Sequence, residues 1–106
     1  MPAGFTVTSL AEAAQMQVND KITARVVKQE SPEDPSVIME LTFAPGAAFG
    51  EDAHRLPEIL IVTDGVFGDG TAEYGVGSVI IGTPGSVHFP QSKDGCTVLA
   101  FHPVGL

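Results

Sequence analysis

The chain has little of three things that mark common functional classes: basic residues, cysteines and long hydrophobic runs. Its 106 residues include five Lys and Arg against thirteen Asp and Glu, so the formal net charge is −8. Contacts to phosphate groups need clustered Lys or Arg, and here the few basic residues are scattered. The composition therefore argues against nucleic acid and anionic membrane surfaces as partners.

The single cysteine, Cys96, excludes an intramolecular disulfide and is compatible with a reducing compartment. The longest apolar run, residues 59–62, has the length of a strand and falls far short of the roughly 20 residues that a membrane-spanning helix needs. The first residues lack the basic and apolar regions of a signal peptide. We therefore expect a cytoplasmic protein without a membrane segment.

What the chain does contain is short segments rich in Val, Ile, Thr and Phe, punctuated by twelve Gly and eight Pro. This pattern is typical of an all-β sandwich or barrel, and the length suits one domain spanning residues 1–106. Residues 9–16 predict either a short helical turn, since Ser9 and Glu12 have capping-box spacing, or an extended edge. The expected strands lie at residues 21–28, 37–43, 49–54, 58–63, 66–67, 71–74, 78–81, 86–90 and 96–102. So many short strands joined by tight turns predict a closed β-barrel.

Two histidines and two carboxylates form the clearest candidate site, which comprises Asp52, His54, Glu58 and His88. Asp52 and His54 are two residues apart, so on an extended strand their side chains project from the same face. Glu58 follows a short connection, and His88 follows a Pro-Gly turn. These spacings predict that the four side chains converge on one metal ion from neighbouring strands.

The chemistry of this ligand set favours a divalent first-row metal over Ca or Mg. Two neutral imidazoles and two carboxylates leave a divalent ion without net charge, which favours Fe(II) or Mn(II), with Zn or Ni as alternatives. If one carboxylate does not bind the ion, two His and one acid remain, the composition used by non-haem Fe(II) oxygenases. The structural alternative is a solvated Glu58 and a histidine at position 88 that only packs.

The two segments resemble the paired motifs of the cupin superfamily, a family of double-stranded β-helix (jelly-roll) barrels. Motif 1 spans about residues 46–65 and motif 2 about residues 77–92. They read Gly46-x5-Asp52-x-His54-x3-Glu58-x6-Gly65 and Gly77-x5-Thr83-Pro84-Gly85-x2-His88-x3-Ser92. Two shorter segments, Pro84-Gly85-Ser86-x-His88 and Asp94-Gly95-Cys96-Thr97, are similar to those of the ChrR-like cupin group. That group includes the C-terminal domain of a zinc-dependent anti-sigma factor and free-standing cupins related to diketone-cleaving dioxygenases.

The chain departs from the cupin motifs at three positions. Thr83 replaces the motif proline and Ser92 the final asparagine, which are second-order changes. Asp52 stands where the family has its first metal-binding histidine, so it is either a replacement ligand or the mark of a degenerate site. The neighbouring Glu51 would point to the opposite face of a regular strand, and we therefore favour Asp52 as the ligand.

Four further positions have simpler interpretations. Cys96 is expected to be a small buried hydrophobe. His102, before Pro103, is expected to lie at the end of a strand, with a role in the pocket as the alternative. Tyr74 is expected to pack on its hairpin, with a role as proton donor at the barrel mouth as the alternative. The residues expected in the core or the pocket lining are Met39, Phe43, Phe49 and Phe101.

The strand at residues 58–63 is apolar on both faces, which predicts a partner surface. Leu60 and Val62 share the inward side of Glu58, while Ile59 and Ile61 face outward. Outward apolar residues on a barrel need a cover, which a second sheet or a second subunit can supply. The resemblance to cupins favours a homodimer.

The resemblance implies two functions and leaves a third open. The first is a metal-dependent dioxygenase acting on a small dicarbonyl-like substrate. The second is a non-catalytic module that senses a ligand or a metal, related to the cupin domain of the anti-sigma factor. The third is a structural barrel with a vestigial site.

Overall fold

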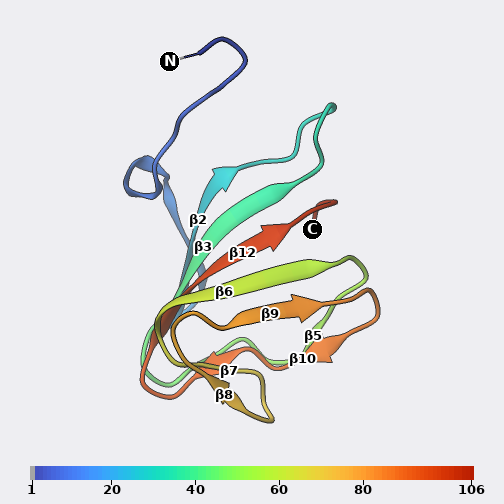
Figure 1. The fold of residues 1–106 in the computed structure, drawn as a ribbon. Helices are drawn as coiled ribbons and strands as arrows, with labels where there is room; N and C mark the ends of the chain where they lie inside the picture. The colour runs from blue at the N-terminus through green and yellow to red at the C-terminus, as the bar shows by residue number, and fades with distance from the viewer. Residues whose placement is uncertain (1) are drawn as a thin grey trace.

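The computed structural model describes residues 2–106 as an almost entirely β-stranded domain (Figure 1). A single 3-10 turn, η1 (Leu10–Glu12), precedes the strands. The long strands are β1 (Gln15–Asn19), β2 (Ile22–Lys28), β3 (Val37–Phe43), β6 (Glu58–Gly65), β9 (Val79–Gly82) and β12 (Cys96–His102). The short strands are β4 (Ala47–Ala48), β5 (Asp52–Ala53), β7 (Phe67–Gly68), β8 (Glu73–Tyr74), β10 (Val87–His88) and β11 (Gln91–Ser92).

The long strands form one six-stranded sheet in the order β1-β2-β3-β12-β6-β9, in which every neighbouring pair is antiparallel. The short strands form a two-stranded sheet, β10-β5, and a four-stranded sheet, β4-β11-β7-β8. In Figure 1 the small sheets lie below the large one, so that the chain wraps around a common interior. This is the predicted jelly-roll barrel of an all-β domain.

The core lies between the large sheet and the small sheets. Phe67, Val98 and Ala100 are fully buried, and Phe43 meets Phe67 edge-on with ring centroids 5.9 Å apart. Along β12 buried and half-buried residues alternate, as the two-residue period of a strand requires. Cys96 is buried in this core and burial raises the pKa of its thiol, which confirms the interpretation as a packed residue.

Two glycines of the sequence motifs are required by local geometry. Gly65 ends β6 with φ of 70°, and a Cβ at this position would lie 2.2 Å from the carbonyl oxygen of Gly95. Gly85 has φ of 89° in the turn where the Ser86 N–H donates to the Thr83 carbonyl. This is the third position of a turn that begins Thr83-Pro84, where a positive φ favours glycine. The turn sends the chain back toward β10 and so toward His88.

Several expectations about local structure are incomplete or wrong. Within residues 9–16 the helical part is limited to η1, where the Ser9 hydroxyl accepts from the Glu12 N–H, and the chain is already in β1 at Gln15. The expected strands at 49–54, 71–74 and 86–90 are regular only in β5, β8 and β10. Phe101 does not line the core: the buried positions of β12 are the even-numbered ones, so Phe101 faces the outer side of the sheet.

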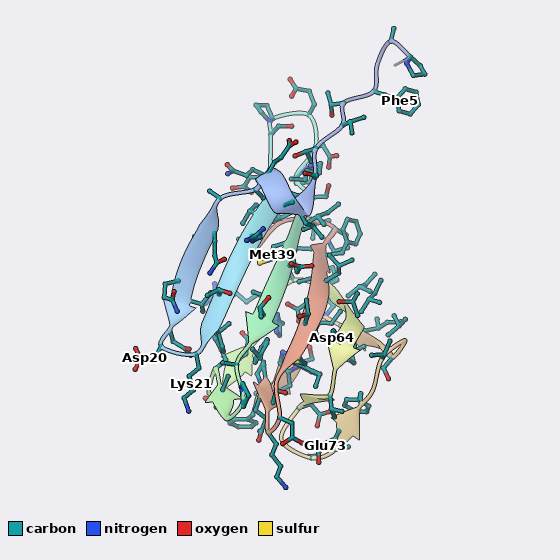
Figure 2. The ribbon with its side chains drawn as sticks, turned by 90° about the vertical axis from the view of Figure 1, so that its left-hand side faces the viewer. Phe5, Asp20, Lys21, Met39, Asp64 and Glu73 are labelled. Atoms are coloured by element: carbon teal, nitrogen blue, oxygen red, sulfur yellow. The ribbon has the colours of Figure 1, made fainter. Side chains whose placement is uncertain are left out.

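The N-terminal segment extends away from the barrel, with Phe5 near its tip (Figure 2). Its side chain is exposed, as is that of Val7. Within residues 2–106, none of the helical structure has the length and apolar character to span a membrane.

Candidate metal centre

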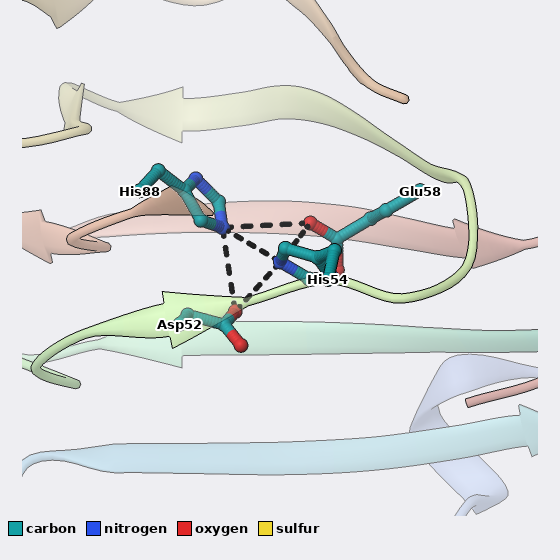
Figure 3. A group of neighbouring side chains, drawn as sticks. All are labelled: Asp52, His54, Glu58 and His88. Carbon is teal, nitrogen blue, oxygen red and sulfur yellow. Dashed lines mark hydrogen bonds and ion pairs between the residues drawn. The ribbon is translucent and has the colours of Figure 1, made fainter. Parts of the chain in front are cut away.

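Strands β5 and β10 bring the first and last members of the predicted cluster together (Figure 3). The two strands are antiparallel, and Asp52 is the direct cross-strand partner of His88. Directly paired residues in an antiparallel ladder project from the same face. Two residues separated by 36 positions in the sequence therefore have side chains in contact, with Asp52 Oδ2 at 3.3 Å from His88 Nε2.

His54 is held by backbone hydrogen bonds that prolong this pairing beyond β5. Its N–H donates to the Ser86 carbonyl at 2.8 Å, and its carbonyl accepts from the Gly85 N–H at 2.7 Å. These bonds fix the backbone of His54 on the same side as Asp52, two residues earlier. Its Nε2 lies 2.9 Å from Asp52 Oδ2 and 2.9 Å from His88 Nε2.

Glu58 completes the cluster from the first position of β6. Its side chain is buried and shares the inward side of the strand with Leu60 and Val62. Its Oε1 lies 3.3 Å from His54 Nε2 and 3.7 Å from His88 Nε2. The structure thus brings together all four residues that the sequence predicts: one ligand atom of each lies within 4.8 Å of the others.

Burial shifts the pKa of two of these groups. It lowers the pKa of His88, and the neighbouring His54 acts in the same direction. Burial raises the pKa of Glu58, which His54 opposes and the Asp52 carboxylate reinforces. A cation between the four side chains would replace this costly arrangement of buried polar atoms by bonds to neutral imidazoles and carboxylates. The donor set therefore fits a divalent transition metal.

His102 lies at the end of a strand, as expected, and also lines the cavity, which the sequence interpretation gave only as the alternative. It is the last residue of β12, its ring is buried, and its Nε2 lies 3.4 Å from Glu58 Oε2. One oxygen of Glu58 thus faces the cluster and the other faces His102. Partners of this kind orient a ligating carboxylate. The alternation of β12 puts His102 on the inward side, but its meeting with Glu58 depends on the pairing of β12 with β6, where Ala100 opposes Leu60.

A cavity of about 740 Å³ opens beside the cluster. Three of the four candidate ligands, Asp52, His54 and Glu58, line it together with His102. The rest of its wall is mostly apolar and comes from the inner face of β1, β2 and β3 and from the segment around β5. These apolar residues include Met16, Val18, Ile22, Val26, Met39, Leu41, Phe43, Phe49 and Leu56. The predicted roles of Met39, Phe43 and Phe49 in the core or the pocket lining are confirmed.

Tyr74 lies outside this cavity lining and packs against the core cluster. Its hydroxyl donates to Asp69 Oδ2 at 2.6 Å, within the turn that joins β7 to β8. This agrees with packing on the hairpin rather than with a proton donor at the barrel mouth.

Fold and site together define a small cupin, a jelly-roll barrel with a histidine and carboxylate cluster on its inner wall. The chain belongs to the ChrR cupin-like domain family, whose model matches residues 4–104. A comparison with curated proteins finds no match.

Solved structures share this fold at low sequence identity. The anti-sigma factor ChrR of Rhodobacter sphaeroides, in complex with SigE, superposes with a TM-score of 0.74 and 21% identity over 89% of this chain. The chain spans 50% of the length of that protein. The polyketide cyclase RemF of Streptomyces resistomycificus superposes with a TM-score of 0.83 and 18% identity. The match covers 94% of this chain and 80% of the cyclase chain. An acetylacetone dioxygenase of Acinetobacter johnsonii superposes with a TM-score of 0.76 and 14% identity. The match covers 97% of this chain and 75% of the dioxygenase chain.

Proposed function

We propose that the chain is a metal-dependent cupin enzyme, a dioxygenase that acts on a small dicarbonyl-like substrate. The observation that carries this proposal is the convergence of Asp52, His54, Glu58 and His88 beside an apolar cavity. Fe(II) or Mn(II) are the metals that the ligand set favours, with Zn or Ni as alternatives. The similarity of fold to an acetylacetone dioxygenase supports the choice of reaction class.

The residues of the chain have separate roles in this proposal. A bound Fe(II) or Mn(II) would supply a Lewis acid for the substrate oxygens, while the dicarbonyl substrate itself, whose carbon–carbon bond is cleaved, would supply the electrons that reduce O2. Asp52 and Glu58 balance the charge of the ion, and the two histidines complete its ligand set. His102 contacts Glu58 Oε2, the carboxylate oxygen that faces away from the cluster, and so positions the carboxylate. The apolar wall of the cavity excludes water from the reacting groups.

Oxygen uptake tests the proposed reaction. The purified chain is loaded with Fe(II) without air, and O2 consumption is followed after addition of acetylacetone. We expect uptake that depends on both metal and dicarbonyl and that is lost in His88→Ala. A wild-type protein that holds Fe(II) and consumes no O2 with acetylacetone or larger diketones would contradict the proposal.

The alternative function is a non-catalytic module that senses a ligand or a metal. The family match and the similarity of fold to the anti-sigma factor ChrR favour it. A protein that binds metal and dicarbonyl ligands without consuming O2, and whose unfolding temperature rises on binding, would support this function over catalysis.

The assembly is part of the proposal. We propose that residues 1–106 form one cupin domain, that the protein is cytoplasmic, and that it forms a homodimer through the outer face of β6 and β9. Ile61, Val79 and Ile81 are exposed on this face, and the register pairs Ile61 with Val79 and Ile59 with Ile81. Light scattering should give twice the 11.0 kDa mass of the chain, and Ile81→Glu should return it to the monomer. A monomeric wild-type protein at micromolar concentration would contradict the dimer.

A further inference from the structure

The cavity extends far beyond the candidate metal ligands. Glu58 lies on β6, whereas Met16 and Val18, which also line the cavity, lie on β1. In the six-stranded sheet β1 and β6 are four positions apart, which corresponds to roughly 19 Å along the sheet at the usual strand spacing. The volume of the cavity, about 740 Å³, is within the range for pockets that bind drug-sized ligands. A substrate as small as acetylacetone would occupy only the end next to the cluster.

Apolar side chains dominate the wall away from the cluster. They come from three consecutive strands: β1 contributes Met16 and Val18, β2 contributes Ile22, and β3 contributes Met39 and Leu41. Met16 is 54% exposed and Val18 40% exposed, so apolar surface faces an open cavity. Ile22 is buried and Met39 and Leu41 are half-buried, so the wall continues from this exposed edge into the core.

The charges around the cavity select against anionic ligands. Arg55 is the one Lys or Arg among the residues that line it, and its side chain is exposed. The four cluster residues carry two negative charges, which a divalent ion would reduce to zero. The whole chain has a net charge of −8, which repels anions at longer range. Neither the metal-free nor the metal-loaded site therefore offers the positive charge that a dicarboxylate needs.

We infer that the substrate is a neutral, mainly apolar molecule that carries a chelating pair of oxygens at one end and a hydrocarbon or aromatic body. This inference rests on the proposed function, because it assigns the oxygens to the metal and the body to the wall formed by β1, β2 and β3. Small dianions such as oxalate are excluded by charge. Acetylacetone has the correct chelating end and lacks the body.

Binding without turnover tests this inference separately from catalysis. The full chain is loaded with Mn(II) in the absence of O2 and titrated calorimetrically with oxalate, acetylacetone and benzoylacetone, in which a phenyl group replaces one methyl. We expect benzoylacetone to bind at least about tenfold more tightly than acetylacetone, because its ring buries apolar area, and oxalate not to compete. Equal affinity for the two diketones, or tighter binding of oxalate, would overturn the inference.

A matched pair of variants locates the apolar body. Met16→Glu and Gln17→Glu place the same charge on neighbouring residues of β1, one lining the cavity and one outside its lining. We expect Met16→Glu to weaken benzoylacetone binding about tenfold and leave acetylacetone and Mn(II) binding unchanged, and Gln17→Glu to change none of them. Both positions are exposed, so the variants should fold. Equal benzoylacetone affinity in the two variants would show that the ring lies elsewhere and overturn the inference.

The two proposals fail in different ways. Preference for benzoylacetone without O2 uptake would retain the ligand class and refute the dioxygenase. O2 uptake at equal efficiency with both diketones would retain the dioxygenase and refute the ligand class. Preference for benzoylacetone in the metal-free protein alone would place the body correctly and refute the assignment of the oxygens to the metal.

Discussion

Two carboxylates of this barrel, Asp69 and Glu58, have opposite surroundings. Asp69 Oδ1 accepts from the Thr71 N–H and hydroxyl and from the Ala72 N–H, and its Oδ2 accepts from the Tyr74 hydroxyl. These donors, the Tyr74 hydroxyl first, hold the pKa of Asp69 well below its usual range. Glu58 is buried beside imidazoles, with no backbone N–H and no side-chain hydroxyl among its partners in residues 2–106, and burial raises its pKa.

The difference separates a structural carboxylate from a candidate ligand. Asp69 is saturated with donors that belong to its own turn, so folding alone satisfies it. Glu58 shares its surroundings with a second carboxylate and three histidines, whose ring nitrogens can each take a metal or a proton. A cation can bridge groups of this kind, so Glu58 and not Asp69 is the candidate metal ligand.

The largest expected effect is on metal affinity. Replacing Glu58 by Gln removes one ligand charge and should weaken Mn(II) binding by at least about 100-fold, more than loss of an outer partner usually costs. Asp69→Asn is the matched control, since it makes the same change in a carboxylate of the same domain and should leave Mn(II) affinity unchanged. Calorimetric titration measures both. Equal affinities in the two variants would remove the distinction between the carboxylates.

His102 should have the next largest effect, because it touches Glu58 on the side away from the cluster. His102→Phe keeps an aromatic ring in the buried position and removes the nitrogen that faces Glu58 Oε2. We expect Mn(II) affinity to fall about 10-fold, within the range for outer partners of metal ligands. The unfolding temperature of the metal-free protein serves as the control for packing. Unchanged Mn(II) affinity would mean that His102 does not position Glu58.

The Asp69 carboxylate should affect the free energy of unfolding and not the affinity for Mn(II). Asp69→Ala removes an acceptor of four hydrogen bonds in the β7–β8 turn and should lower the free energy of unfolding by about 1 kcal/mol, given partial solvent exposure. Urea unfolding of the metal-free protein measures this change. A variant as stable as the wild type would show that the turn forms without its carboxylate.

The smallest expected effect is the pH dependence of the folding stability that the Asp69–Tyr74 hydrogen bond contributes. The pKa of Asp69 is lowered by folding, so its contribution to stability is complete above 3.8 and is lost as the pH falls through the folded-state value. The pKa of Tyr74 is raised by Asp69, so its contribution is complete below 10 and is lost at higher pH.

Tyr74→Phe should therefore be slightly less stable than the wild type at neutral pH and equally stable at both extremes. The carboxyl carbon of Asp69, followed by NMR, should titrate at higher pH in this variant. An Asp69 pKa that does not move would mean that the hydroxyl does not interact with the carboxylate in solution.

The sequence predicts the residues of the site better than their contacts. The two-residue period of strands and the Pro84-Gly85 turn are local, and they suffice to place Asp52, His54 and His88 on one side. The contact of His102 with Glu58 depends on which strands pair, which is a property of the whole sheet. Phe101 was misplaced because residue type was given more weight than the alternation of β12, which puts the neighbouring Ala100 inside. Residues 15–19 pair with β2, and the alternation of Met16 and Val18 with polar residues is the local pattern that indicates this strand.

The four-ligand site is tested most directly by anomalous X-ray diffraction from crystals of the wild-type chain grown with Mn(II). We expect one anomalous peak per chain at bonding distance, about 2.0–2.3 Å, from Asp52, His54, Glu58 and His88. Asp52 is the residue at which the chain departs from the cupin motif, so its distance to the peak is the informative one. A peak bound by the other three residues with Asp52 turned away would reduce the site to two His and one acid. No peak at the cluster in crystals that hold Mn(II) elsewhere would contradict the account.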